Sequence, residues 1–319
     1  MSILISIVIP SFNQGRYIEQ TIVSIIEQDY KNVEIIIIDA GSKDETIAVI
    51  KKYEQHISYW VSEPDRGQSH AINKGLEKCT GEIFNWINSD DYLEPGALTV
   101  IANAFEQNKN AKVICGYTRC FFDEDNVTSH EYRMGVKKTV ADSIAFVEMN
   151  QPGSFYLTKV VKDFGGVNES LRYVFDDELW FRFLCKYGIE KVILSDARFA
   201  QFRLHGSSKS VGEGFALFGK EINALYIDVL KNINAPEWLL KCMNETDHSD
   251  KYISSGKWDL TQLEAERFTA FFAAKYVNTL YVQNKKSFAK QAMKLTLDNN
   301  LFKWNRMMIS LRLKLLFVK

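Results

Sequence analysis

The feature that most constrains the fold is a strict alternation of apolar runs and amphipathic segments in the first third of the chain. Four apolar runs are typical of buried strands: residues 3–9, 33–38, 57–61 and 83–87. Between them, residues 16–28, 44–53 and 69–79 space their apolar side chains as one face of a helix requires. This alternation predicts an α/β fold with a mostly parallel sheet flanked by helices.

Acidic side chains follow three of these strands. Asp39 comes directly after the second run, Asp65 lies in the loop after the third, and Asp90 and Asp91 follow the fourth. The carboxyl ends of parallel strands meet at one edge of a sheet, where ligands bind. Adjacent carboxylates repel each other and are costly to bury, and a divalent cation such as Mg²⁺ or Mn²⁺ would offset both effects. The simpler interpretation, an acidic turn that only caps the next helix, stays open for each acid alone.

The loops after the strands also indicate which ligand to expect. Four acidic positions on one edge fit a nucleoside whose base and ribose are bound by carboxylates, with a metal covering its phosphates. Neither a GxGxxG pattern nor a P-loop follows the first strand, which runs into Pro10, Ser11 and Phe12. This argues against a dinucleotide or ATP site.

Composition narrows the class of protein further. The chain has 319 residues, of which 46% are hydrophobic and 25% charged, and its net charge is −1. These values are ordinary for a globular protein and give no global field that would attract nucleic acid. Five cysteines without CxxC spacing fit a reduced, cytoplasmic protein without a zinc site. With no signal peptide pattern and no apolar run of 18 residues, we expect no membrane span.

The rest of the chain divides near residue 216. Before it, we expect a helix at 98–108, a strand at 112–122 with a hairpin turn into 127–133, and a strand near 151–156. After it, strand patterns vanish, and four helices are predicted at 216–232, 234–245, 261–283 and 285–297. The domains expected are therefore residues 1–215, with a nucleotide-binding half (1–100) and an acceptor half (101–215), and a helical region at 216–319.

Several of these loops together carry a family resemblance. The segments SIVIPSFNQGRY (residues 6–17) and IIIIDAGSKDET (residues 35–46) resemble the opening of the family 2 glycosyltransferases. Residues 62–98 (SEPDRGQSHAINKGLEKCTGEIFNWINSDDYLEPGAL) resemble a bacterial branch of that family that makes surface polysaccharides. The resemblance extends over roughly residues 3–215. It implies a GT-A fold, a nucleotide-sugar donor, a divalent metal (Mn²⁺ or Mg²⁺) and an inverting mechanism.

The resemblance also implies roles for individual residues. The donor would be bound by Pro10, Ser11 and Phe12 around the base, Asp39 on the base, Asp65 and Gln68 in the following loops, and Asp90 near the ribose. Asp91 would bind the metal. Two positions depart from the family pattern, because Ala40 replaces an Asp and Asn88 replaces an Asp. Neither departure removes Asp39, Asp90 or Asp91, so the assignment is kept.

A second acidic segment lies at residues 173–183. Asp176, Asp177 and Glu178 crowd the first turn of a predicted helix, where the helix dipole favours carboxylates, and plain capping would explain them. The functional interpretation is a general base that takes a proton from an acceptor hydroxyl. The segment resembles the family's Glu-Asp-x-Asp-Leu-Trp-x-Arg motif with Phe175 at its leading Glu. On that alignment Asp176 is the base, and Glu178 is the fallback.

A third segment surrounds His205. A lone histidine is most often structural, but this one follows a predicted strand and precedes a Gly-Ser-Ser-Lys-Ser loop. The segment resembles the family's Tyr-Arg-x-His-x-x-Ser-x-Ser loop, which closes over the diphosphate. By that resemblance His205 binds the metal or a phosphate, with support from Arg203, Ser208, Lys209 and Ser210.

The last segment, residues 301–319, combines five Lys or Arg and no acid with many large apolar side chains. This composition fits an interfacial helix on anionic lipid, and packing on its own bundle or in a homodimer is the alternative. The hypothesis is therefore a cytoplasmic glycosyltransferase, peripheral on the membrane, that moves a hexose-type sugar from a UDP-sugar to a glycan or lipid-linked acceptor. The alternatives are a sugar-phosphate nucleotidyltransferase and a silent nucleotide-sugar-binding protein.

Overall fold

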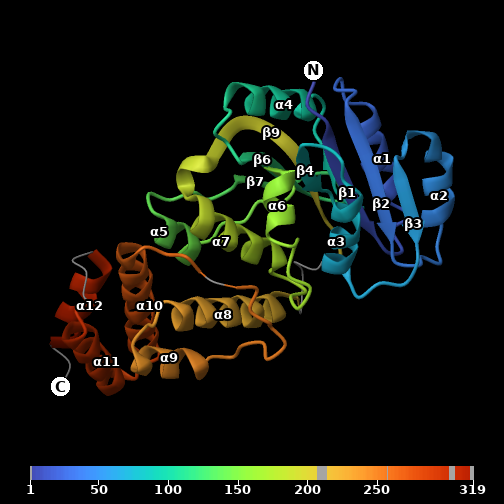
Figure 1. Ribbon diagram of the computed structural model, residues 1–319. Coiled ribbons are helices and arrows are strands. Elements are labelled where there is room, and N and C mark those ends of the chain that lie inside the picture. Colours follow the sequence, from blue (N-terminus) through green and yellow to red (C-terminus); the bar gives the residue numbers. More distant parts are fainter. Residues whose placement is uncertain (1, 207–213, 257, 302–305, 317–319) are drawn as a thin grey trace. The chain divides into compact units, whose positions relative to one another are not determined.

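The computed structural model describes residues 2–206, 214–256, 258–301 and 306–316. Within these residues the chain divides into two compact units (Figure 1). The first contains residues 1–136 and 148–218, and the second contains residues 137–147 and 219–319. The sequence-based boundary at residue 216 assigned residues 137–147 to the first domain, and here they group with the second unit.

One mixed sheet forms the centre of the first unit. Its path through the described residues is β3-β2-β1-β4-β8-β6-β9-β5, and β7 pairs with β6 outside this path. The strands are β1 (Ile5–Ser11), β2 (Val33–Asp39), β3 (Tyr59–Ser62), β4 (Ile83–Trp86), β5 (Tyr92–Leu93), β6 (Val113–Phe122), β7 (Thr128–Arg133), β8 (Ser154–Leu157) and β9 (Val192–Leu204). The pairs β1–β2, β1–β4, β2–β3 and β6–β9 are parallel, and β8 is antiparallel to both β4 and β6. The predicted GT-A-like α/β fold with a mostly parallel sheet is confirmed.

Helices cover this sheet. They are α1 (Ile18–Ile26), α2 (Thr46–Lys52), α3 (Gln68–Lys78), α4 (Ala97–Gln107), α6 (Thr158–Asp163) and α7 (Phe175–Tyr187). Alternate residues of β1, Ile5, Ile7 and Ile9, join one buried cluster with side chains of α1, α2 and α4. Val8, which lies between Ile7 and Ile9 in the strand, faces α3. A Cβ atom added to Gly75 of α3 would come within 2.4 Å of the Val8 side chain. Glycine at position 75 therefore lets α3 approach the sheet closely.

The first strand ends later than the sequence suggested. Pro10 was expected to stop it, but β1 continues through Pro10 to Ser11, which pairs with Asp39. The pairing with β4 on the other side ends at Val8. Beyond Val8 the strand has a neighbour on one side only, and proline is tolerated where its missing N–H interrupts no ladder. The polar loop after β1 therefore begins next to Asp39.

The second unit is helical within the described residues. It contains α5 (Val140–Ala145), most of α8 (Gly214–Asn232), α9 (Glu237–Asn244), α10 (Gln262–Val282), α11 (Lys286–Asp298) and α12 (Arg306–Leu316). The N–H of Ala141 in α5 donates to Glu264 in α10 (2.8 Å), and Phe146 stacks edge-on against Phe271 (4.4 Å). These contacts explain why residues 137–147 group with this unit.

No helix among the described residues is long and apolar enough to cross a membrane. The basic helix expected at residues 301–319 is represented by α12, and residues 302–305 and 317–319 of that prediction lie outside the described part.

Candidate active site

The Asp90–Asp91 turn lies shortly after β4 and is held from several sides. Its backbone is fixed by the hydroxyl of Thr21 in α1, which donates to the Asp91 carbonyl (2.6 Å). The Asp91 side chain is buried, with Oδ1 accepting from the N–H of Arg203 (2.9 Å) and Oδ2 from Asn88 (3.2 Å). Burial, and then the charge of Asp90, raise the pKa of Asp91 well above its ordinary value. A cation that binds beside two neighbouring carboxyl groups favours their ionised form.

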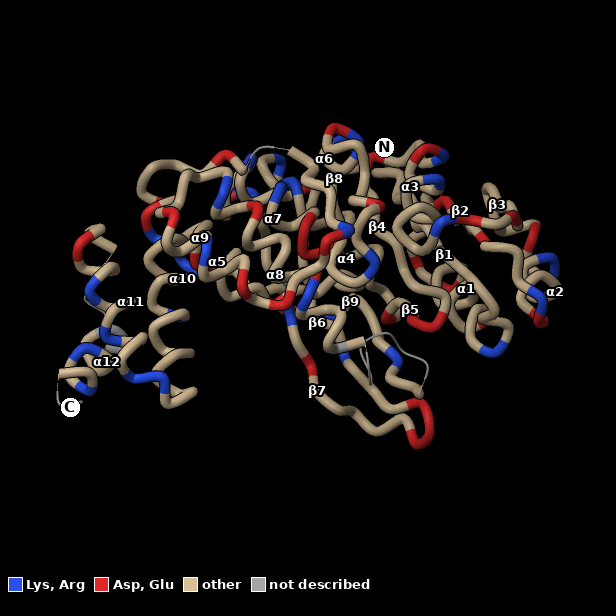
Figure 2. Tube along the Cα trace, turned by 90° about the horizontal axis from the view of Figure 1, so that it is seen from below, with Lys and Arg blue, Asp and Glu red and all other residues tan. Residues whose placement is uncertain are grey.

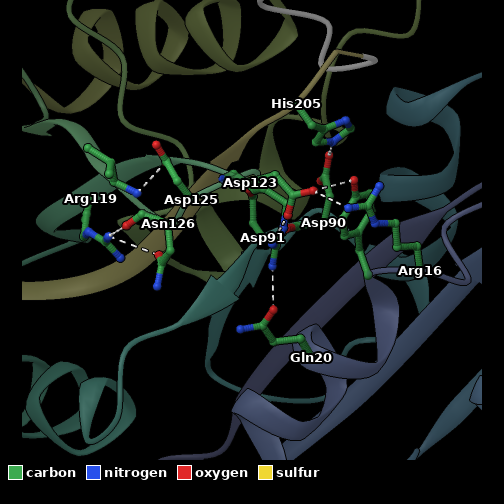
Figure 3. Close-up of polar contacts among 12 residues, drawn as sticks. Arg16, Gln20, Asp90, Asp91, Arg119, Asp123, Asp125, Asn126 and His205 are labelled. Atoms are coloured by element: carbon green, nitrogen blue, oxygen red, sulfur yellow. Dashed lines mark hydrogen bonds and ion pairs between the residues drawn. The ribbon is translucent and has the colours of Figure 1, made fainter.

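Asp90 points in a different direction, toward β9. Its Oδ2 lies 2.9 Å from Nε2 of His205, which directly follows that strand (Figure 3). The His205 ring also lies against Tyr17, with centroids 4.9 Å apart. The structure therefore brings His205 to the acidic turn, as expected, but its direct partner is Asp90 and not Asp91.

Arg203 is bound by the protein itself. Its guanidinium donates to Asp123 (2.6 Å), Gln20 (2.5 Å) and the carbonyl of Asp90 (2.9 Å), and it lies over the rings of Tyr17 and Phe121. Figure 3 shows the contact with Gln20 below the acidic turn. These bonds engage the group that was expected to bind the donor, so the geometry favours a role in holding the turn.

Asp123 is the residue that the sequence analysis missed. It lies at the start of the loop after β6, and it also accepts from Arg16 (2.8 Å) and from the hydroxyl of Tyr17 (3.1 Å). Partial burial raises its pKa, but the bonds from Arg203 and Tyr17 outweigh this and hold the pKa of Asp123 below its ordinary value. The sequence showed this residue only as part of a polar hairpin turn, and its partner Arg203 is 80 residues away.

The residues expected around the base lie at the ends of β1 and β2. Pro10 and Ser11 are buried at the end of β1, whereas Phe12 is 56% exposed. Asp39 is buried, and its two oxygens accept from the N–H groups of Gly41 and Ser42 and from the hydroxyls of Ser42 and Ser62. Its carboxylate thus organises the loop after β2.

Side-chain amides connect the segment after β3 to the acidic turn. Gln68, at the start of α3, donates to Asn88 (2.6 Å), which in turn donates to Asp91. Asp65 instead accepts from the N–H of Gly67 (2.7 Å), a local turn contact. Gln68 therefore joins the site directly, whereas Asp65 shapes the loop before it. Lys209, Ser208 and Ser210 lie outside the described residues.

The three acids at the start of α7 differ in environment. Glu178 is fully buried and paired with Arg182 (2.7 Å), which also donates to the carbonyls of Phe164 and Gly166. Asp177 is 1% exposed, and its Oδ2 has no hydrogen-bond partner among the described residues. Burial and the neighbouring Asp176 raise the pKa of Asp177 well above its ordinary value. Asp176 is less buried than either neighbour.

One ring contact connects α7 to the strand that precedes the acidic turn. The ring of Trp86, at the end of β4, lies 6.1 Å from that of Phe175, at the start of α7. The pKa of Tyr132 in β7 is raised by burial, by Cys120, and by the charges of Asp91 and Asp176. Asp91 and Asp176 both belong to the first unit.

The side chains at the acidic turn limit the kind of metal site that could form there. Among the described residues, no cluster of three or more His, Cys, Asp or Glu side chains is arranged to hold a metal ion. At the turn, Asp90 and Asp91 carry carboxylate oxygens and His205 carries an imidazole nitrogen, but the three are not arranged as such a cluster. Such a set fits a metal that takes its remaining ligands from substrate phosphates, as Mg²⁺ commonly does.

Comparison with known proteins gives the family. Residues 6–164 match the sequence model of the family described as "Glycosyl transferase family 2". This chain belongs to glycosyltransferase family 2. An uncharacterized glycosyltransferase of Rickettsia typhi is 29% identical over 245 residues, which is 74% of this chain and 74% of that protein. Another, from Rickettsia prowazekii, is 31% identical over 56% of this chain and 58% of its own length.

Two more proteins extend the comparison. Chondroitin synthase of Escherichia coli is 28% identical over 187 residues, and the chain matches 26% of that longer protein. Among solved structures, residues 1–349 of TarS from S. aureus give a TM-score of 0.58 at 17% identity, over 86% of this chain and 72% of that one. This family 2 glycosyltransferase therefore shares its fold with TarS.

Proposed function

We propose that this family 2 enzyme is a metal-dependent, inverting glycosyltransferase that moves a sugar from a UDP-sugar to a glycan or lipid-linked acceptor. The observation that supports it most is the contact of His205 with Asp90 in the acidic turn, within the same compact unit as the partly exposed Asp176. TarS has been crystallised with UDP and with UDP-GlcNAc, and chondroitin synthase is a polysaccharide synthase by name. These names favour a UDP-sugar donor and a glycan acceptor, and the resemblance of residues 62–98 favours surface polysaccharide as the product.

In this proposal the loops after β1 and β2 bind the nucleoside. Phe12, exposed next to the end of β1, supplies an aromatic face for the base. Pro10 and Ser11 wall the pocket, and Asp39, whose carboxylate holds the neighbouring loop in shape, hydrogen-bonds the base. Asp90 lies toward the ribose and diphosphate, and Asp65, Gln68 and Arg203 shape the loops around it. Lys209, which lies outside the described residues, would help to bind the donor.

Asp91 and His205 are proposed to hold Mn²⁺ or Mg²⁺, and the direct contact of His205 with Asp90 adds that carboxylate to the set. The metal would neutralise charge on the diphosphate leaving group. Asp176 accepts the proton of the acceptor hydroxyl, whose oxygen then attacks the anomeric carbon from the side opposite the diphosphate. The glycosidic bond to the diphosphate breaks as the new bond forms, so the configuration inverts without a covalent enzyme intermediate.

The first test is a donor screen. UDP-, GDP- and dTDP-sugars are incubated with the protein and a divalent metal, and release of the nucleoside diphosphate is measured. We expect release from a UDP-sugar that stops in excess EDTA and returns with added Mn²⁺. Full activity in EDTA would contradict the metal role. Release of inorganic diphosphate (pyrophosphate) from UTP plus a sugar phosphate would indicate a nucleotidyltransferase instead.

A further inference from the structure

The charge of the chain is sharply divided along its length. Residues 267–319 contain eleven Lys or Arg and one acid, Asp298, which gives a net charge of +10. Residues 1–266 contain the other 28 basic and 39 acidic residues, which gives −11. The overall value of −1 therefore conceals a strongly basic C-terminal segment. Figure 2 shows Lys and Arg bands on α11 and α12.

Part of this segment forms an exposed turn between α10 and α11. Every residue from Val282 to Phe288 is exposed, including Lys285 and Lys286 in the middle. The two ends of the turn are apolar, since Val282 is 73% and Phe288 is 61% exposed. Exposed apolar side chains therefore lie on both sides of the two lysines.

The end of α12 adds to the same surface. Lys314 lies over the ring of Tyr281, the residue before Val282, with its Nζ 5.7 Å from the ring centroid. The neighbouring Leu313 and Leu316 are 52% and 67% exposed. The inner faces of α10, α11 and α12 are buried against one another around Val277, Met293 and Leu311, among others. The outward side chains thus do not serve the core of this unit.

We propose that residues 282–288, with Leu313, Lys314 and Leu316, form a tip that inserts its apolar side chains into an anionic lipid surface. The lysines fit the negative surface potential of such a membrane, and the apolar side chains fit its headgroup–acyl boundary. This extends the membrane association expected for residues 301–319 to a second element, and it rests on the proposed lipid-linked acceptor. Nucleic acid also attracts basic residues, but it offers nothing to exposed Val282, Leu313 and Leu316.

The test is co-sedimentation of the full-length chain with phosphatidylcholine vesicles, with and without phosphatidylglycerol. Replacing the lysine pair (Lys285→Glu with Lys286→Glu) should weaken binding to the anionic vesicles by at least about tenfold. Phe288→Ser should weaken binding at high salt as well, because its contribution is not screened. An unchanged melting temperature shows that each variant is folded.

Matched controls come from exposed residues elsewhere. Lys109→Glu with Lys251→Glu reverses two exposed charges, and Leu263→Ser removes a side chain that is 54% exposed at the other end of α10. These should bind like the wild type. Equal loss in the controls, or wild-type vesicle binding by the tip variants, would overturn the inference, as would binding to duplex RNA but not to vesicles.

Sugar-nucleotide hydrolysis in vesicle-free solution measures the proposed activity separately. Hydrolysis without vesicle binding would overturn only the docking inference. Loss of vesicle binding on deletion of residues 301–319, with no effect of the tip variants, would limit the contact to the tail.

Discussion

At the scale of single residues, three adjacent acids on α7 have three different surroundings. Glu178 is neutralised by Arg182 inside the protein, and Asp177 is buried with one oxygen unpartnered. Of the three, only Asp176 is partly exposed. A general base must be both reachable by substrate and ionised, so these differences support Asp176 and argue against Glu178 as the fallback base.

Asp176→Asn should therefore lower kcat by about 10²- to 10⁴-fold while donor affinity is retained. The corresponding change at the nearby Glu178–Arg182 ion pair, Glu178→Gln, should instead lower the free energy of unfolding by about 3–5 kcal/mol. Arg182 would be left buried without its partner charge. Steady-state kinetics and thermal unfolding separate the two effects. Near-normal turnover in Asp176→Asn, with loss of turnover in a folded Glu178→Gln, would move the base to Glu178.

At the scale of elements, β9 is the strand that assembles the acidic turn. It pairs with β6 along most of its length and with the short β5, which follows the turn. Its last residues supply the N–H of Arg203 to Asp91 and the Arg203 side chain to Asp123. The turn is thus held by α1, β6 and β9 together, and its geometry depends on a strand that arrives more than 100 residues later in the chain.

Arg203→Lys should lower the free energy of unfolding by at least about 2 kcal/mol, since an ammonium cannot replace a guanidinium that bonds to Asp123, Gln20 and a carbonyl at once. The control is Arg198→Lys on the same strand. Arg198 is 37% exposed and pairs with Glu131, so the change there should cost less than about 1 kcal/mol. Denaturant unfolding measures both, and equal effects would show that the Arg203 network is no more than a surface ion pair.

At the scale of the whole molecule, the core of the first unit is closed to solvent. Cys79, Cys115 and Cys120 are at most 3% exposed, and burial raises the pKa of each thiol to about 12. The other two cysteines, Cys185 and Cys242, are half-buried. Because the thiolate is the reactive form, a raised pKa leaves roughly one thiol in ten thousand ionised at pH 8.

An aromatic disulfide reagent at pH 8 should therefore label at most two of the five thiols quickly in the native protein, and all five in denaturant. The double change Cys185→Ser with Cys242→Ser should remove the fast phase. Since the thiolate fraction of a buried thiol rises with pH, labelling of the slow three should accelerate between pH 8 and pH 10. Rapid labelling of three or more thiols in the native state would show that the core is open.

Much of the fold follows from local pattern. The spacing of apolar residues placed β1, β2, β3 and β4 and the three helices between them to within a few residues, because the period of a strand or helix is a local property. The same pattern put Asp39, Asp90 and Asp91 at strand ends, since a polar loop must follow a buried strand. What it could not show was that Pro10 is tolerated inside β1, which depends on where β4 stops pairing.

The partners of the site residues were decided by tertiary structure alone. Arg203 was expected to meet the donor, but packing of β9 beside β6 brought it to Asp123, 80 residues away. The same packing places His205 next to Asp90, although the two residues are 115 positions apart in the sequence. Sequence determines which side chains can carry a charge and which element each occupies, because those depend on neighbours along the chain. Which charge meets which depends on the register of strands distant in sequence, and only the folded sheet fixes that.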